Sequence, residues 1–390
     1  MTRAELMRRF GIYSGIVVVG ASASLGVRAW EQGVFTGQDA IAYEPWQNWR
    51  TYHGPRALVA AAILAANAHD FQPWIFHIAD DRIDLYADLV RNIGAADPFD
   101  REMDIGLGCA LENLVLAAAP NGYSAEVTLL PEAANPAHVA RIQLTSRDGR
   151  ASSLYEQIPR RHSNRGPFDR TRDLSPGDLQ QLAVGLERAS NEARIVWFVT
   201  PSDRRMVGDL LIEATQAFIA DEAQSRASYA GLRSGPRDIA LQKDGITLDA
   251  QGLSTPLTAL VKLLPTSSRS AGDAFWLATT RDTHVATAAA FGMVVVKDPS
   301  DRAQRLVGGR LLQRIHLAAT QRGIALQHMN QLTERADRER SLGIAPRFGD
   351  ALRALVRAPW SSLSTFRLGY PLRVANASPR RSVEDVLHDA

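Results

Sequence analysis

The sequence predicts an α+β protein with two pseudo-symmetric halves fused in one chain, each half a mixed or antiparallel sheet flanked by helices. Helical and strand patterns alternate along the chain from about residue 40 onward. Residues 74–78 and 83–87 show strand patterns on either side of Asp80 and Asp81, which is typical of a hairpin. The helical segment 108–118 matches the segment 309–319 without a gap, which indicates an internal duplication.

The composition excludes several classes of protein. The chain has 390 residues, 45% hydrophobic and 22% charged, so it is globular and forms one large domain or two medium ones. A net charge of +2 without a polybasic run gives no indication of a nucleic-acid partner. Cys109 is the only cysteine, which excludes an intrachain disulfide and a multi-thiolate zinc site. We expect its thiol to be buried and inert.

Residues 1–30 are predicted to be a signal peptide or membrane anchor outside the fold. Arg8 and Arg9 precede an uncharged apolar stretch containing Ala21-Ser22-Ala23, the pattern of a secretory signal with a cleavage site. The arginine pair resembles a twin-arginine signal. The alternatives are an uncleaved membrane span and a weakly apolar helix without a targeting role. We therefore expect a periplasmic or exported protein, with inner-membrane anchoring as the second reading and the cytoplasm as the least favoured location.

The first half is predicted to span residues 40–150. It contains expected helices at 57–66 and 106–119 and strands at 74–78, 83–87, 124–130 and 139–144. The second half, 151–390, repeats this order, with helices at 179–188, 203–220 and 308–323 and strands at 195–200, 291–296 and 364–372. Residues from about 226 to 270 are rich in Gly, Ser and Pro, so we expect an irregular, lid-like insertion there.

The matched helices carry the evidence for duplication. The identical pairs are Gly108 with Gly309, Leu111 with Leu312, Leu116 with Leu317, Ala117 with Ala318, Ala118 with Ala319 and Gly122 with Gly323. Two unrelated apolar helices would also share Ala and Leu, but the glycines frame segments of equal length. His316 falls opposite Val115 in this alignment, so we expect it to be structural.

One basic motif suits a phosphate group. Arg161 and Arg165 lie four residues apart around Ser163, and His162 lies between them. A helix beginning there would offer free backbone N–H groups, a hydroxyl and two guanidinium groups to an anion. Taken alone, such a cluster is more often a solvated basic face.

A second motif suits a planar ring. The predicted helix ends in small and polar residues, Asn67 and Ala68 followed by Asp70, and then Gln72 and Pro73 lead into the aromatic strand at Trp74. Small side chains let a ring approach the backbone, and amides can bind its polar edge. Taken alone, the segment reads as an ordinary helix-to-strand loop.

Together the two motifs resemble the nitroreductase superfamily, in particular its Acg-type FMN-binding branch of fused single-chain proteins. The stretch 161–169 is similar to the family's first FMN motif, which implies that Arg161, His162, Ser163 and Arg165 bind FMN. The stretch 65–74 is similar to the family's QPW loop, which packs on the flavin and implies roles for Asn67, Ala68, Asp70, Gln72 and Pro73. The match is partial, because Asp70 stands where the family has Asn. A basic residue near the family's C-terminus reaches the phosphate, which nominates Arg380 or Arg381.

The resemblance implies a flavoprotein with one composite site. The first half holds the QPW loop and the second half the phosphate motif, so one FMN per chain is expected in a monomer that mimics a dimer. The implied activity is that of an NAD(P)H-dependent oxidoreductase that passes hydride through flavin N5 to a small nitro- or quinone-type acceptor. No catalytic side chain and no metal are expected. Two alternatives stay open, a flavin-storing protein with a closed lid and a tethered scaffold without flavin. The flavin assignment depends on the loop ending at Trp74 and the turn beginning at Arg161 facing one cleft.

Overall fold

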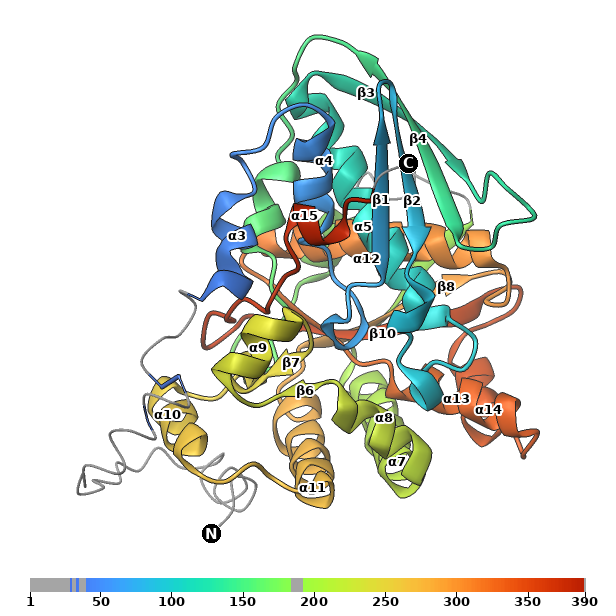
Figure 1. The fold of residues 1–390 in the computed structure, drawn as a ribbon. Coiled ribbons are helices and arrows are strands. Elements are labelled where there is room, and N and C mark those ends of the chain that lie inside the picture. Colours follow the sequence, from blue (N-terminus) through green and yellow to red (C-terminus); the bar gives the residue numbers. More distant parts are fainter. Residues whose placement is uncertain (1–28, 30–32, 35–39, 184–191, 389–390) are drawn as a thin grey trace.

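The computed structural model describes residues 29, 33–34, 40–183 and 192–388 (Figure 1). Four strands form a first antiparallel sheet in the order β1-β2-β4-β3. They are β1 (Trp74–Ala79), β2 (Arg82–Ala87), β3 (Tyr123–Leu129) and β4 (His138–Ser146). The predicted hairpin is confirmed, because Trp74 pairs with Ala87 and Ala79 with Arg82 around the turn at 80–81.

A second four-stranded antiparallel sheet has the order β5-β8-β10-β9. Its strands are β5 (Ala193–Phe198), β8 (Ala290–Val296), β9 (Ala325–His328) and β10 (Ser361–Gly369). Numbered by their order along the chain, the strands of both sheets lie side by side in the order first, second, fourth, third, and one long helix connects the second strand to the third. The expected α+β class with an antiparallel sheet in each half is thus confirmed.

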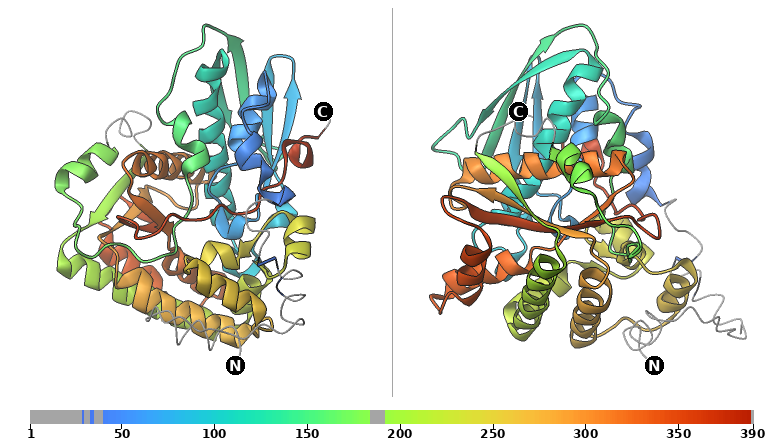
Figure 2. Two further views of the ribbon diagram at one scale, coloured as in Figure 1. Left: turned by 90° about the vertical axis from the view of Figure 1, so that its left-hand side faces the viewer. Right: turned by 180° about the vertical axis from the view of Figure 1, so that it is seen from behind.

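The two long connecting helices pack against each other between the sheets (Figures 1 and 2). They are α5 (Arg101–Ala118) and α12 (Arg302–Gln321). A Cβ at Gly108 would lie 2.2 Å from the Leu306 carbonyl oxygen, and one at Gly309 would lie 2.2 Å from that of Ile105. The glycines matched in sequence therefore meet at the helix crossing, where their missing side chains allow backbone contact.

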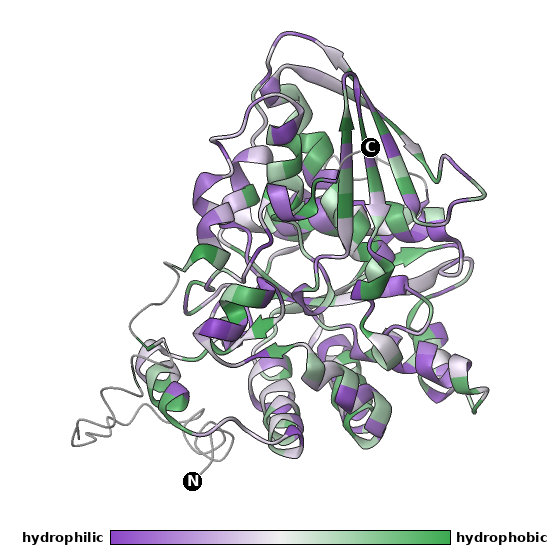
Figure 3. Ribbon diagram, in the orientation of Figure 1, coloured by the Kyte–Doolittle hydropathy of each residue, from purple (hydrophilic) through white to green (hydrophobic). Residues whose placement is uncertain are grey.

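Helix α5 is the one described helix that is long and apolar enough to cross a membrane, and most of it is buried in the core. Figure 3 shows hydrophobic residues concentrated in the strands and central helices, with hydrophilic residues on outer helices such as α13 and α14. Cys109 lies in α5, and burial raises the pKa of its thiol to about 12, as expected for an inert residue. The predicted signal at residues 1–30 falls almost entirely outside the described residues.

Further helices surround the sheets. Those of the first half are α3 (Glu44–Asn48) and α4 (Pro55–Ala62), and the second half contributes α6 (Pro176–Ala183), α7 (Pro201–Ala220), α13 (Gln331–Leu342) and α14 (Arg347–Leu355). The C-terminal α15 (Val383–Val386) returns to the first half, where the amide of His388 donates to the Phe76 carbonyl oxygen at 3.0 Å. The tail of the second half is thereby fixed against β1.

The expectation of an irregular segment at 226–270 is wrong. The segment forms α8 (Glu222–Ala230), α9 (Pro236–Gln242), α10 (Thr255–Leu263) and the start of α11 (Arg269–Thr279), with a small parallel pair of β6 (Leu232–Arg233) and β7 (Ile246–Thr247). Pro236 and Pro256 occupy the first turns of α9 and α10, where proline favours helix initiation. We call residues 222–279 the cover segment.

Candidate functional site

The two motifs line one small pocket, as the sequence prediction required. Asn67 and Asp70 of the loop before β1 lie opposite Arg161, Ser163 and Arg165. The remaining lining residues are Ala66, His162, Gly245, Ile246, Ala250, Asn376, Ser378 and Arg380. The pocket adjoins a cavity of about 450 Å³, since Asn67, Ser163 and Arg165 line both. A cavity of that size suits a small-molecule ligand or cofactor.

The small pocket collects more positive than negative charge. Arg161 and Arg380 are buried, and burial lowers the pKa of Arg161 to about 9, with repulsion from Arg380 adding to the effect. Among the described residues, neither Arg161 nor Arg165 forms an ion pair, whereas Arg380 pairs with Asp70. Three guanidinium groups thus face one carboxylate. Because an uncompensated buried charge is costly, this pocket is suited to an anion.

Backbone carbonyls hold the guanidinium groups in place. Arg161 donates to the Leu64 carbonyl oxygen at 2.9 Å and Arg380 to that of Ala65 at 3.1 Å, so both contact the first residues after α4. Arg165 donates to the Ala250 carbonyl oxygen at 3.3 Å, which belongs to the cover segment. Each contact leaves donors free, and the Nε atoms of Arg161 and Arg380 are buried without a partner among the described residues.

The predicted helix start at Arg161 is wrong. A short 3₁₀ helix ends at Arg160, and Arg161 has extended backbone angles. Arg367 of β10 holds the extended stretch, because its buried guanidinium donates to the carbonyl oxygens of Gly166 at 2.6 Å and Asn164 at 3.3 Å. Side chains, and not a helix dipole, therefore make the pocket positive.

His162 and His316 support the pocket as neutral groups. Burial, together with the nearby arginines, lowers the pKa of His162 to about 3. Its ring packs edge-on against Trp46 at a centroid distance of 4.5 Å, and Arg380 lies 4.8 Å from the centre of the same Trp ring. His316 Nε2 lies 3.3 Å from the His162 carbonyl oxygen and its Nδ1 3.5 Å from Arg161 Nη1, so His316 has the expected structural role.

Three predicted binding residues do not line either cavity. Gln72 is fully buried and donates to the Lys243 carbonyl oxygen at 2.8 Å, while its own carbonyl accepts from the Arg381 amide at 2.8 Å. Arg381 donates to the Asp385 carbonyl oxygen at 2.6 Å. Pro73 accepts from the Asp88 amide at 3.1 Å. Gln72 and Arg381 thus join the loop to the tail and the cover segment, whereas Pro73 bonds to Asp88 after β2. Contacts of these three residues with a cofactor stay predictions.

The loop before β1 is strained where it borders the site. His69, Asp70 and Gln72 have positive φ values of 49°, 59° and 54°, which non-glycine residues rarely adopt. Burial raises the pKa of Asp70 to about 6, against the attraction of Arg380. A hydrogen bond from the Gln72 amide to Asn67 Oδ1 at 2.8 Å helps to hold this conformation.

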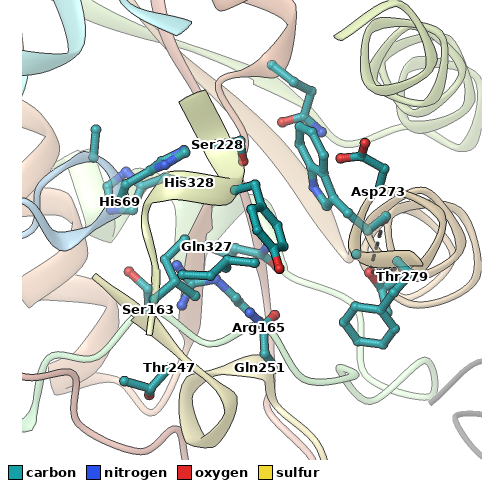
Figure 4. A pocket seen from close by; sticks show the side chains of 18 of the residues that line it. His69, Ser163, Arg165, Ser228, Thr247, Gln251, Asp273, Thr279, Gln327 and His328 are labelled. Atoms are coloured by element: carbon teal, nitrogen blue, oxygen red, sulfur yellow. Dashed lines mark hydrogen bonds between the residues drawn. The ribbon is translucent and has the colours of Figure 1, made fainter. Parts of the chain in front are cut away.

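The larger cavity contains residues that the sequence did not reveal. Figure 4 shows His69, Ser163, Arg165, Gln327 and His328 around it, with Asp273 and Thr279 on the far side. The cover segment supplies Tyr229, Phe275 and Trp276, whereas Asn330, Gln331 and Glu334 come from the start of α13. The pKa values of His69 and His328 are lowered by burial to about 4 and about 3. Both rings carry a buried nitrogen without a partner among the described residues, His69 Nδ1 and His328 Nε2.

The cover segment is fastened to the loop before β1. The Gly245 amide donates to the Asp70 carbonyl oxygen at 3.2 Å. Arg91 donates both to the Phe71 carbonyl oxygen and to Asp244 Oδ2, each at 2.9 Å. The cover segment could only move away from the cavity if these contacts broke.

Comparison with known proteins finds relatives that are named as NAD(P)H nitroreductases. No family model matches the chain. It is 23% identical over 342 residues to Acg of Mycobacterium tuberculosis strain H37Rv, assigned by name as an NAD(P)H nitroreductase, and the match covers 85% of this chain and 95% of that protein. It is 26% identical over 219 residues to Rv3131 of the same strain, also assigned by name as an NAD(P)H nitroreductase. That match spans 53% of this chain and 62% of the relative's length.

Solved structures of similar proteins carry related names. The nitroreductase NfnB from Sphigopyxis sp. strain HMH, described as FMN- and NADPH-dependent, is 14% identical, with 61% of this chain and 98% of that chain covered at a TM-score of 0.40. A nitroreductase from Desulfovibrio desulfuricans in complex with FMN is 13% identical, with 60% and 95% covered at a TM-score of 0.32. Over most of its length the chain resembles the Acg-type proteins of the nitroreductase superfamily.

Proposed function

We propose that the chain binds one FMN across the small pocket and the adjoining cavity and acts as an NAD(P)H-dependent, nitroreductase-like oxidoreductase. The observation that carries the proposal is the charge of the small pocket, three guanidinium groups facing one carboxylate. A phosphate monoester carries a charge of about −1.5 to −2 near neutral pH, which would compensate the two unpaired guanidinium groups. The name of the Acg relative supports the same assignment.

The residues present fit such a cofactor. Arg161 and Arg380 line the pocket and each has a buried Nε without a partner among the described residues, and Ser163 adds a hydroxyl to the lining. The larger cavity begins at Arg165 and continues between Asn67, Ala68 and His69 on one side and the cover segment on the other. Small and planar side chains there would let a flat ring lie against the loop before β1. His69 and His328 would bring neutral ring nitrogens to its polar edge.

Bound FMN would supply two-electron redox chemistry between a reduced pyridine nucleotide and a small nitro- or quinone-type acceptor. The protein would contribute position and charge. Arg165 lines both cavities, so its cation can stabilise negative charge that develops on a ligand where they meet. Arg367 holds the backbone around Arg165 in place, because it donates to the carbonyl oxygens of the two neighbouring residues, Asn164 and Gly166.

A second function, storage of FMN without turnover, is favoured by one observation. The cover segment closes much of the larger cavity and is tied to the loop before β1 through Asp244 and Gly245. A segment held in this way would block an electron donor or acceptor. In the oxidoreductase, NADH or NADPH reduces the bound flavin, whereas in the storage protein neither of them does.

The absorption spectrum of the purified protein tests both functions. We expect a yellow protein whose flavin absorbance bleaches anaerobically with NADPH or NADH, whereas a retained flavin that never bleaches supports storage. The double variant Arg161→Ala with Ser163→Ala should lose its flavin. Arg160→Ala is the matched control, because Arg160 is the exposed neighbour of the same stretch and should retain FMN. FMN content in the double variant equal to that of the wild type would refute the site.

We also propose three features that follow from the sequence. The repeated strand order and the meeting of Gly108 with Gly309 support an internal duplication, in which one chain replaces a dimer. The composite site supports a monomer, which sedimentation would test. The arginine pair before the apolar stretch supports export, and cell fractionation with N-terminal sequencing of the mature protein would test it.

A further inference from the structure

The larger cavity has one wall whose chemistry opposes that of the arginine pocket. Glu102 of α5 and Glu334 of α13 both line it, beside the amide side chains of Asn330 and Gln331. Glu102 is occupied, because it pairs with Arg101 at 2.5 Å and accepts from Asn330 Nδ2 at 2.6 Å. Because the carboxylates would repel a phosphate, this wall is better suited to an uncharged ligand that shares the cavity.

Glu334 differs from the other acidic residues near it. The residue is 7% exposed, yet among the described residues its carboxyl group forms no hydrogen bond and no ion pair. Only its backbone carbonyl accepts a bond, from Gln224 Nε2 at 3.4 Å. A buried carboxyl group that borders a cavity without a partner is costly as an anion. It is suited to donate a hydrogen bond or a proton to a ligand.

The charged groups around Glu334 favour its neutral form. Burial raises its pKa well above the ordinary value, and Glu102, Asp97 and Asp337 act in the same direction, while Arg101 opposes them. Asp273 of α11 lines the same cavity from the cover segment. Arg101 opposes these charges only in part, because its guanidinium also pairs with Glu102 and Asp337, although its Nη2 has no partner among the described residues.

We propose that Glu334 is the proton donor for reduction of an aromatic carbonyl acceptor, of the quinone class, bound between α13 and the aromatic residues of the cover segment. Tyr229, Phe275 and Trp276 provide the apolar surface for such a ring. The inference rests on the proposed oxidoreductase function and adds a catalytic residue to it.

The step balances with reactants that the proposed function already names. Reduction of a quinone by NADPH breaks the C4–H bond of the nicotinamide and forms two O–H bonds, one at each carbonyl oxygen. The two electrons come from NADPH and one of the two protons comes from an acid, which gives hydroquinone and NADP⁺. The Glu334 carboxyl supplies that proton to the carbonyl oxygen and becomes a carboxylate. It is protonated again from water before the next turnover. A carboxyl that is neutral at pH 7 suits this task better than an exposed one.

Infrared spectroscopy on protein labelled with [13C]glutamate tests the protonation state without reference to activity. We expect the FMN-loaded protein to show a protonated-carboxyl C=O band at pH 7 that is absent from Glu334→Gln. Absence of any such band from the labelled wild type would overturn the proposal, and so would a band that persists in the variant.

The pH dependence of quinone reduction tests the catalytic role. We expect kcat/KM of the wild type to fall as the pH rises through the titration of Glu334, because only the protonated form donates. Glu334→Gln should keep its FMN and its bleaching by NADPH but lose about a hundredfold or more in quinone turnover, together with this pH dependence. Glu334→Asp should recover part of both. A Glu334→Gln variant with the wild-type rate and pH profile would overturn the proposal. Failure of the proposed function would show separately, as a wild-type protein without FMN or without bleaching.

Discussion

The crossing of α5 and α12 predicts that Gly108 cannot accept even a methyl group. An alanine Cβ there would lie 2.2 Å from the Leu306 carbonyl oxygen and 3.0 Å from Gly309 Cα. Ordinary carbon–oxygen contacts are about 3.3 Å or longer, so the helices would have to separate by about 1 Å. Because the opposing atoms belong to a helix backbone, no side-chain rotation relieves the contact. Gly309→Ala presents the same problem against the Ile105 carbonyl oxygen.

The expected loss follows from two opposing effects. Overpacking of this kind costs about 1–3 kcal/mol, and a clash with backbone should lie near the upper value. Replacing a helical glycine by alanine returns about 1 kcal/mol of helix propensity. We therefore expect Gly108→Ala to lower the free energy of unfolding by about 2 kcal/mol. Combining it with Gly309→Ala should cost less than the sum of the two, because one helix displacement relieves both contacts.

Urea unfolding monitored by circular dichroism and tryptophan fluorescence on the same samples provides the assay. Gly349→Ala is the matched control, since Gly349 lies within α14 and its added Cβ would find its nearest neighbour, Pro346 Cβ, at 3.4 Å. That variant should be stabilised by about 0.5–1 kcal/mol. The reasoning is refuted if Gly108→Ala is as stable as Gly349→Ala.

Three further predictions concern the site. Folding lowers the pKa of His162 from 6.5 to about 3, so the folded state favours the neutral ring, and this contribution to stability is present above pH 6.5 and is lost as the pH falls. The FMN-free protein should therefore lose about 2 kcal/mol of its free energy of unfolding between pH 7 and pH 5. His162→Gln should lose less over the same range, as measured by thermal unfolding. Arg367→Lys should lower the melting temperature and weaken FMN binding at least tenfold in fluorescence titration, because lysine cannot bond both carbonyls beside Arg165. Asp244→Asn should raise the FMN dissociation rate about tenfold, because it weakens the bond from Arg91 that holds the cover segment.

Each of these predictions has a distinct contrary result. An unchanged pH dependence in His162→Gln would mean that other groups dominate acid destabilisation. Wild-type FMN affinity in Arg367→Lys would show that the extended stretch is held without Arg367. For the cover segment the control is Arg226→Ala, which removes an exposed ion pair with Glu222 in α8 and should leave FMN release unchanged. Equal release rates in both variants would contradict the role of Asp244.

Local patterns in the sequence were sufficient for most of the elements. The hairpin of β1 and β2 follows from residue alternation around a polar turn, and α7 is confirmed almost to the residue because Thr200 and Asp203 form a capping box at its start. The glycine match predicted that α5 and α12 correspond. The basic motif and the loop before β1 also named Arg161, Ser163, Arg165 and Asn67, all of which line the pocket.

Tertiary structure alone decided how these residues act. The spacing of Arg161 and Arg165 suits a helical turn, but the stretch is extended because Arg367, far along the chain, takes its carbonyls. The cover segment is helical although its composition suggested a loop, since packing against the cavity and the loop before β1 stabilises short helices that are weak in isolation. Burial and the absence of a partner, which distinguish Glu334, depend on side chains from distant elements. A sequence can place charges in order along a chain, but whether a charge finds a partner depends on what the fold brings beside it.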